Sequence, residues 1–304
     1  MNSTIIKRLF KQTIPLLPGY QSFCSVLQKH RPKKWEWIDR IPVKPGILVL
    51  VNSSVGSFYM SRPERCSIAK KYFWTRGVRE PIEDRIALNL FANLSKYSNA
   101  VLDIGANSGL FSLVAAKSNP DAQILAIDIL TESYHVIVDN LILNNLLGKV
   151  DIQLIGVGES AKTFYAPFNN ISSDMPSSLS LDSKAINDDL VEVSIKSLDE
   201  ICIPRLVGKT LCIKIDVEGT EVDIFLHGSE TLRVIKPDII CEVLPSARQF
   251  DIYDQILDNY SYHKYLITDV GLKRFDQIKP DMRFKDWFFT TKNNFDIDIE
   301  ELLR

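Results

Sequence analysis

The sequence lacks several features that define common classes of protein. None of its five cysteines forms a C-x-x-C pair, and its four histidines show no metal-ligand spacing. An odd, scattered set of cysteines argues against a disulfide framework and against a zinc ribbon. Because Cys212 and Cys241 lie within apolar runs typical of strands, we expect reduced, buried thiols and a cytoplasmic protein.

Residues 1–35 lack acidic side chains and any long apolar run. Lysine, arginine and proline interrupt this segment, so we expect neither a signal-peptide core nor a transmembrane helix there. Two interpretations remain open, namely a basic segment that rests on an anionic membrane and a solvated extension packed on a domain. The basic residues concerned are Lys7, Arg8, Lys11, Lys29, Arg31, Lys33 and Lys34.

Short apolar runs alternate with helical stretches from about residue 98 onward, which is typical of βαβ units and a parallel sheet. We therefore predict an N-terminal basic extension at residues 1–75, with a hairpin around Ile47–Met60, and one α/β domain at residues 76–304. The predicted strands are Ala100–Ile104, Ile124–Ile127, Asp151–Val157, Val191–Ile195, Leu211–Asp216, Pro237–Val243, Tyr262–Thr268 and Phe284–Thr290. The predicted helices are Ser108–Lys117, Thr131–Leu147 and Glu221–Arg233, and residues 169–190 are predicted to form a surface loop.

A glycine turn follows the first of these domain strands. The run from Asp103 to Gly109 has no middle glycine, which differs from the G-x-G-x-x-G turn of NAD-binding folds. Gly105 and Gly109 permit positive φ and close approach of a ligand, and the next helix directs its positive end toward a carboxylate. At the end of the next strand, Asp128 is placed to accept ribose hydroxyls and Ile129 to cover an adenine face. An ordinary tight turn is the alternative for the glycines.

A second group of polar residues follows the strand Leu211–Asp216. Asp216, Glu218 and Glu221 lie within six residues, and Glu242 ends the strand after that. Crowded carboxylates raise one another's pKa, which suits a general base, and they also suit Mg²⁺. Glu221 falls in the first turn of a helix, where the helix dipole alone favours an acid. Lys214 either pairs with one of these acids or reaches the site itself.

With both regions in view, residues 78–245 resemble the FkbM family of class I methyltransferases. The resemblance implies a seven-stranded, Rossmann-like, mostly parallel sheet with helices on both faces, its last strand antiparallel, and S-adenosylmethionine as cofactor. One departure is Asp128-Ile129, where the family usually has glutamate followed by proline. The matching segments are Arg79–Pro81, Val101–Gly109, Ala126–Asp128, Asn140–Asn144, Ser177–Leu179, Ser197–Asp199, Ile213–Glu221 and Cys241–Val243. The cofactor-binding residues that follow are Glu80, Asp103, Gly105, Ala106, Asn107, Gly109, Asp128 and Ile129.

The predicted function is transfer of a methyl group to a hydroxyl of a sugar, glycan, glycolipid or similar polar metabolite. Asp216, Glu218 and Glu242 are the catalytic candidates, with base and metal mechanisms both open, and Ser177 and Ser178 the candidates for substrate contact. The alternatives are an NAD-binding oxidoreductase or epimerase and a non-catalytic binder that retains the fold. A nucleic-acid partner is not expected, because the net charge is −2 and the core carries no basic excess. The acceptor and the oligomeric state stay open.

Overall fold

The computed structural model describes residues 13–30, 41–160, 163–167, 190–217, 219–245, 250–279, 281–293 and 302. Its helices are η1 (Ile14–Leu16), α2 (Tyr20–His30), α3 (Ser67–Trp74), α4 (Ile82–Lys96), α5 (Leu110–Ser118), α6 (Thr131–Leu143), α7 (Leu198–Leu206), α8 (Glu221–Leu226), η3 (Thr231–Ile235) and α9 (Phe250–Asn259). Its strands are β1 (Val49–Ser53), β2 (Gly56–Met60), β3 (Ala100–Ile104), β4 (Gln123–Asp128), β5 (Val150–Leu154), β6 (Gly156–Val157), β7 (Thr163–Pro167), β8 (Leu190–Lys196), β9 (Leu211–Ile215), β10 (Asp238–Glu242), β11 (His263–Thr268), β12 (Gly271–Phe275) and β13 (Asp286–Thr290).

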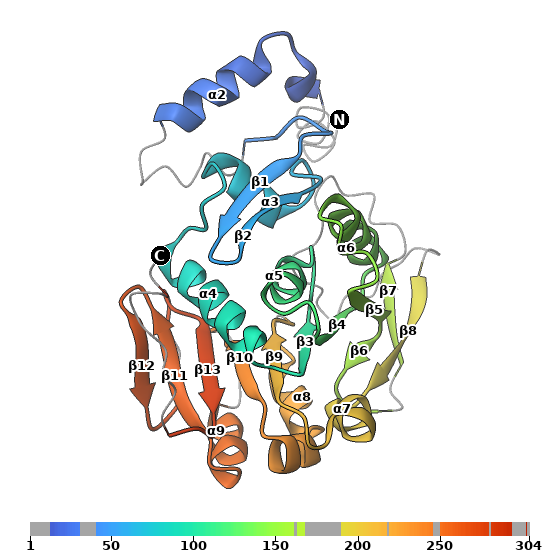
Figure 1. The fold of residues 1–304 in the computed structure, drawn as a ribbon, viewed down its shortest axis with the longest axis vertical. Helices are drawn as coiled ribbons and strands as arrows, with labels where there is room; N and C mark the ends of the chain where they lie inside the picture. The colour runs from blue at the N-terminus through green and yellow to red at the C-terminus, as the bar shows by residue number, and fades with distance from the viewer. Residues whose placement is uncertain are drawn as a thin grey trace, which may run out of the picture.

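One large sheet organises the molecule. Its strand order is β12-β11-β13-β10-β9-β3-β4-β5, and the five strands from β10 to β5 run parallel. The last strand in sequence, β13, is antiparallel and inserts between β10 and β11. The predicted seven-stranded Rossmann-like sheet is therefore confirmed, with β12 added as an eighth strand at the edge seen at the red end of the chain in Figure 1.

Helices cover both faces of this sheet because its central strands are apolar on both sides. All five residues of β3 are buried, as expected for a strand in a doubly covered parallel sheet. Its successive residues alternate between two core clusters: Val101 packs with α4, α5 and α6, whereas Leu102 and Ile104 pack with α7, α8 and α9. The parallel strands consequently bring their carboxyl ends to one edge of a layered core.

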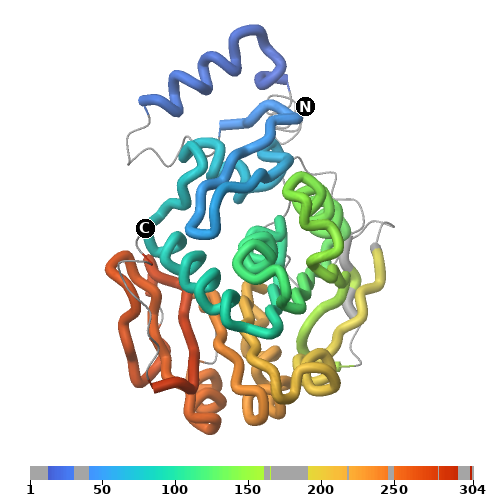
Figure 2. Tube along the Cα trace, in the orientation of Figure 1, coloured from blue at the N-terminus to red at the C-terminus, as the bar shows by residue number. Residues whose placement is uncertain are grey.

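The N-terminal part adds a hairpin and a helix to this core. β1 and β2 form an antiparallel hairpin at the predicted place, and its Val51 and Phe58 pack in the same cluster as α4 and α5. Beyond the hairpin, α2 lies at the outer end of the molecule, where Figure 2 shows it in blue. Tyr20 and Cys24 anchor α2 against Trp74. The domain boundary at residue 75 stays a prediction.

Several predicted elements have different bounds in the structure. The helix predicted to run to Leu147 ends at Leu143. The helix predicted over Glu221–Arg233 is interrupted after Leu226, and a short π-helix follows at Thr231–Ile235. Gly228 lies in this interruption and packs closely against α7, since a Cβ added there would lie only 2.7 Å from Leu198 Cδ2. The strand predicted at Val191–Ile195 belongs to a separate small sheet, in the order β6-β8-β7.

None of the helices in the described ranges combines the length and the apolar composition needed to cross a bilayer.

Candidate active site

A cavity of about 540 Å³ opens at the carboxyl ends of β3, β4, β9 and β10. This is the edge of an open α/β sheet where ligands are expected, and the volume lies within the range of small-molecule sites. Of the residues predicted to bind a cofactor, Gly105, Asn107, Asp128 and Ile129 line this cavity. Asp216 and Glu242, predicted for catalysis, line it as well.

The glycine turn after β3 has the backbone conformation that the sequence predicted. Gly105 and Gly109 have φ values of +81° and +73°, and Asn107 lies between them at +48°. A Cβ on Gly105 would overlap the carbonyl oxygen of Asp216, so this position tolerates only glycine. The turn therefore packs directly against the end of β9. It joins the two stretches of sequence that carry the predicted site.

Asp128 is buried at the end of β4 and holds the turn in place. Its two carboxylate oxygens accept hydrogen bonds from the backbone N–H groups of Asn107 (2.8 Å) and Leu130 (2.9 Å). Burial raises the pKa of Asp128, while these N–H donors oppose the rise. Beside it, the side-chain oxygen of Asn107 is buried and has no hydrogen-bond partner among the described residues. Asp128 thus fixes the glycine turn at the cavity wall.

Four other residues predicted to contact the cofactor are not part of the cavity lining. Asp103 is buried beneath the turn, where it accepts hydrogen bonds from the backbone N–H (2.9 Å) and hydroxyl (2.7 Å) of Ser112. Its burial raises its pKa to about 6. Ala106 is buried and Gly109 caps α5, whereas Glu80 is exposed. Within the segment Arg79–Pro81, the cavity is lined by Arg79 and Pro81.

At the opposite end of the cavity, acidic side chains surround the ammonium group of Lys214. Lys214 Nζ lies 3.0 Å from Asp286 Oδ1 and 3.7 Å from Asp216 Oδ2. Burial alone lowers the pKa of Lys214, but Asp286, Asp216 and Glu242 outweigh burial and hold this pKa above its usual range. Both interpretations of Lys214 are confirmed, since it pairs with acids and lines the cavity. The Asp216 side chain is 40% exposed and accessible from the cavity.

Glu221 does not line the cavity. It is fully buried, and its carboxylate accepts a hydrogen bond from the backbone N–H of Gly219 (2.8 Å) and one from the Tyr253 hydroxyl (3.3 Å). These contacts fix the start of α8, as the structural interpretation of this acid predicts. Glu218, Ser177 and Ser178 lie outside the described residues.

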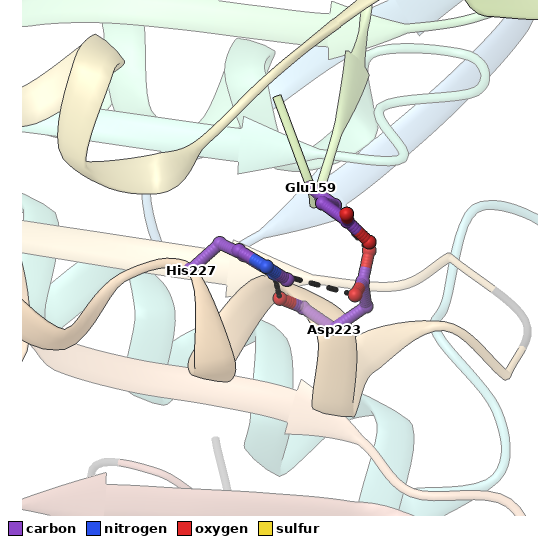
Figure 3. Close-up of side chains that lie close together, drawn as sticks. All are labelled: Glu159, Asp223 and His227. Carbon is purple, nitrogen blue, oxygen red and sulfur yellow. Dashed lines mark hydrogen bonds and ion pairs between the residues drawn. The ribbon is translucent and has the colours of Figure 1, made fainter. Parts of the chain in front are cut away.

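A further group of ligand-type side chains includes Asp223 from the cavity lining, and Figure 3 shows Asp223 together with Glu159 and His227. Their possible ligand atoms lie within 4.8 Å of one another. His227 Nδ1 is 2.9 Å from the Asp223 carbonyl oxygen and 3.3 Å from its Oδ1, and Asp223 Oδ2 accepts the Glu159 backbone N–H at 3.0 Å. These contacts tie the segment after β6 to α8.

Several residues of the cavity lining are not among the site residues that the sequence predicted. Asp286 begins β13, and because β13 is antiparallel, its first residue faces Glu242 at the end of β10. Arg79 and Asp84 precede and begin α4, and they form an ion pair of 3.1 Å. Lys71 and Lys285 complete this wall. The start of an antiparallel strand beside parallel ones is the pattern that would have indicated Asp286.

Comparison with known proteins gives a consistent result. A family model described as the methyltransferase FkbM domain matches residues 103–264, more than half of the chain. Ribosomal RNA large subunit methyltransferase E of Borrelia duttonii is 25% identical over 190 residues, which are 60% of this chain and 87% of that protein. Methyltransferase sdnD of Sordaria araneosa is 32% identical over 141 residues, which are 45% of this chain and 49% of that protein.

Two solved structures are also similar. The methyltransferase FkbM of Methylobacillus flagellatus KT is 17% identical, with a TM-score of 0.42, and the match covers 63% of this chain and 43% of that one. This chain therefore matches less than half of the length of that solved chain. The O-methyltransferase of Bacillus cereus in complex with SAH is 11% identical, with a TM-score of 0.38 and coverage of 69% and 80%.

Proposed function

The chain belongs to the FkbM family of methyltransferases and uses S-adenosylmethionine, and on this premise we propose that it methylates a hydroxyl group of a sugar, glycan, glycolipid or similar polar metabolite. One observation carries the proposal. A single cavity is lined by Asp128 and Asn107 at one end and by Asp216, Glu242 and Lys214 at the other. A methyl donor and a methyl acceptor can therefore be held side by side.

The first end of the cavity fits the methyl donor. Asp128 would accept a hydrogen bond from the ribose hydroxyls, because its carboxylate lies at the end of β4 and lines the cavity. Ile129, which lines the cavity beside Asp128, would cover the adenine. When bound, S-adenosylmethionine supplies a methyl group on a sulfonium, which is already activated for displacement.

The second end supplies a base. An alcohol is a weak nucleophile at neutral pH, so its proton must pass to a positioned acceptor as the new O–C bond forms. We assign the role of general base to Asp216, with Glu242 beside it. Lys214 has the role of positioning both carboxylates. The buried ammonium of Lys214 already occupies the space between Asp216 and Asp286 that a Mg²⁺ ion would need. This arrangement favours a base mechanism over a metal mechanism.

A product assay tests the proposal directly. The enzyme is incubated with S-adenosylmethionine carrying a CD₃ group and a panel of sugars, glycolipids and hydroxylated metabolites, and the products are analysed by mass spectrometry. We expect a CD₃ ether that resists alkaline hydrolysis. Asp216→Asn should lower kcat about 100-fold or more, in the range seen for general bases, without changing the affinity for S-adenosylhomocysteine.

The control variant is Asp121→Asn, which removes an exposed acid far from the cavity lining and should retain full activity. Ribosomal RNA, named for the Borrelia relatives, belongs in the panel as a competing acceptor. Label found on RNA, on an amine or in an alkali-labile ester would contradict the proposal. Full activity of Asp216→Asn would show that Asp216 is not the general base. Binding of NAD in place of S-adenosylhomocysteine would restore the oxidoreductase alternative.

We also propose that the N-terminal region contacts an anionic membrane. α2 and the segment just before it expose four apolar side chains, Leu16, Leu17, Phe23 and Val26. Seven basic and no acidic residues accompany them in residues 1–35. Phe23→Ser/Val26→Ser should reduce flotation with phosphatidylglycerol vesicles at least fivefold, whereas Val270→Ser, at a more exposed site elsewhere, should not. Equal flotation with neutral vesicles would contradict this.

The five buried free thiols support a cytoplasmic location.

A further inference from the structure

Asn140, a fully buried residue of α6, joins two distant parts of the molecule. Its Nδ2 donates a hydrogen bond to the backbone carbonyl oxygen of Ser108 at 2.9 Å. Its Oδ1 accepts hydrogen bonds from the backbone N–H and from the hydroxyl of Ser61, each at 2.8 Å. Because Ser108 and Ser61 are 32 and 79 residues away in sequence, these bonds do not serve α6 itself.

The bond to Ser108 holds the glycine turn. Ser108 lies within this turn, directly before Gly109, whose φ is +73°. The turn also packs closely on α6, since a Cβ on Gly109 would lie 3.1 Å from Cγ1 of Ile137, about one helical turn before Asn140. The backbone N–H of the turn that Asp128 accepts fixes it from the side of β4. The turn is therefore held from two directions, by β4 and by α6.

The bonds to Ser61 hold a wall of the cavity that the N-terminal region supplies. Ser61 directly follows β2, and the chain then runs into α3. Three residues of α3, called here the N-terminal wall, line the cavity: Ser67, Ile68 and Lys71. Asn140 thus connects the glycine turn to the segment that carries this wall.

Asn144 caps the end of α6, four residues after Asn140, and contacts β2 without reaching the glycine turn. Its Oδ1 accepts the backbone N–H of Tyr59 and its Nδ2 donates to the Tyr59 carbonyl oxygen, both at 2.8 Å. Within the described ranges, no hydrogen bond joins the Asn144 side chain to residues 103–109. The two asparagines therefore share the task of docking β2, and Asn140 has the additional link to the turn.

We propose that Asn140 is a positioning residue for methyl transfer, which fixes the glycine turn relative to the N-terminal wall. This proposal rests on the proposed function, since it places the methyl donor against the glycine turn. Methyl transfer requires the attacking oxygen, the methyl carbon and the sulfur to lie in line, so a small shift between the two walls lowers the rate. A buried side-chain amide suits this role, because breaking its bonds leaves polar groups unpaired on both segments.

The first test measures binding of S-adenosylhomocysteine to the full chain by calorimetry. Asn140→Ala removes both links, and we expect its affinity to fall at least tenfold, because the turn is released from α6. The matched control is Asn144→Ala, which removes the hydrogen bonds to Tyr59 but leaves the turn in place, and it should bind within threefold of the wild type. Circular dichroism verifies that each variant is folded.

Asn140→Asp separates the two links, and it replaces Asn140→Ala in the binding test if that variant does not fold. Its oxygens can still accept the hydrogen bonds of Ser61, but an ionised carboxylate has no hydrogen to donate to the Ser108 carbonyl. Hydrogen exchange at pH 8 is compared with and without saturating S-adenosylhomocysteine. In the wild type and in Asn144→Asp, the ligand should slow exchange in the glycine turn and in residues 61–74. In Asn140→Asp, it should slow exchange in the turn only.

A role of Asn140 in docking β2 alone predicts no such difference, because Asn140→Asp retains the acceptor for Ser61. The proposal is overturned if the ligand still slows exchange in residues 61–74 of Asn140→Asp, or fails to do so in the wild type. Equal affinities of Asn140→Ala and Asn144→Ala, or no binding by the wild type, also overturn it. Because neither measurement requires an acceptor, a failure here is distinguishable from a failure of the product assay that tests hydroxyl methylation.

Discussion

The two ends of the cavity neutralise their charges in different ways. At the end where we propose that the methyl donor binds, called the donor end, Asp128 is held by backbone N–H groups of Asn107 and Leu130. At the end where we propose that the hydroxyl acceptor binds, called the acceptor end, the acids are held by the side chains of Lys214 and Arg79. Backbone donors are fixed by the local fold, whereas side-chain partners come from distant segments. The donor end is therefore set by local sequence, and the acceptor end by the way the whole sheet assembles.

The largest expected effect comes from Gly105, where the two ends touch. Gly105→Ala would drive a Cβ into the Asp216 carbonyl oxygen and also strain a φ of +81°. We expect a loss of about 4 kcal/mol or more in the free energy of unfolding, measured by urea denaturation, since backbone must move. Binding of S-adenosylhomocysteine should fall below detection.

Gly148→Ala is the matched control for this prediction. Gly148 has a similar φ of +84°, but nothing lies within 4 Å of its added Cβ. Gly148→Ala should lower the free energy of unfolding only by the backbone strain, about 1–2 kcal/mol, and leave the binding of S-adenosylhomocysteine unchanged. Equal losses in the two variants would show that strain alone matters and that the contact between the ends does not.

Lys214 provides the next test, because it holds the acceptor end together. Lys214→Met leaves Asp286 and Asp216 without their shared cation, and we expect a loss of about 3–5 kcal/mol in the free energy of unfolding. Its kcat in the product assay should fall about 100-fold, while the affinity for S-adenosylhomocysteine stays within a few fold.

Lys264→Met is the control that separates an effect on the free energy of unfolding from an effect on kcat. Lys264 is equally buried, 2% exposed, and it pairs with Asp254 and Asp258 at 2.8 Å outside the cavity. The Lys264→Met variant should lose a similar amount of free energy of unfolding and retain its kcat. If Lys214→Met retained its kcat as well, the acids at the acceptor end would not depend on their cation.

The same contrast explains how far the sequence could predict the structure. The turn from Asp103 to Gly109 and the acid of Asp128 follow from local rules, because glycine positions and strand ends determine them. Arg79 and Asp286 could not be found in this way. Each lies far from Asp216 in sequence, and only the insertion of antiparallel β13 beside β10 and the start of α4 bring them to the cavity. In the segment Arg79–Pro81, Arg79 lines the cavity while Glu80 is exposed and lies outside the lining, so contact between Glu80 and the cofactor stays a prediction.

Asp128→Asn tests the donor end with a smaller expected effect. The amide retains one oxygen for a backbone N–H but places an NH₂ group opposite the other, and it removes the charge offered to the ribose. Hydrogen bonds to charged groups contribute about 1.5–3 kcal/mol, so calorimetry should show S-adenosylhomocysteine binding about 10- to 100-fold more weakly. Asp121→Asn is the control. Unchanged affinity would mean that the ribose lies elsewhere.

The smallest expected effect concerns Asp103, which lies beneath the donor end without lining the cavity. Its pKa is raised by burial from an ordinary 3.8 to about 6, so between these pH values the folded protein holds a proton that the unfolded chain has released. Stability contributed by this proton is present below pH 3.8 and is lost as the pH rises to 6. Asp103→Asn cannot titrate and should lack this slope, about 1 kcal/mol per pH unit.

Urea denaturation of both proteins at pH 4.5, 5.5 and 6.5 measures the difference. Parallel curves would show that the Asp103 carboxyl is ionised in the folded protein throughout this range. In the same variant, the affinity for S-adenosylhomocysteine should change less than in Asp128→Asn, because Asp103 contacts Ser112 and only supports the turn. A larger loss than in Asp128→Asn would reverse this order and place Asp103 itself in contact with the donor, as the sequence first indicated.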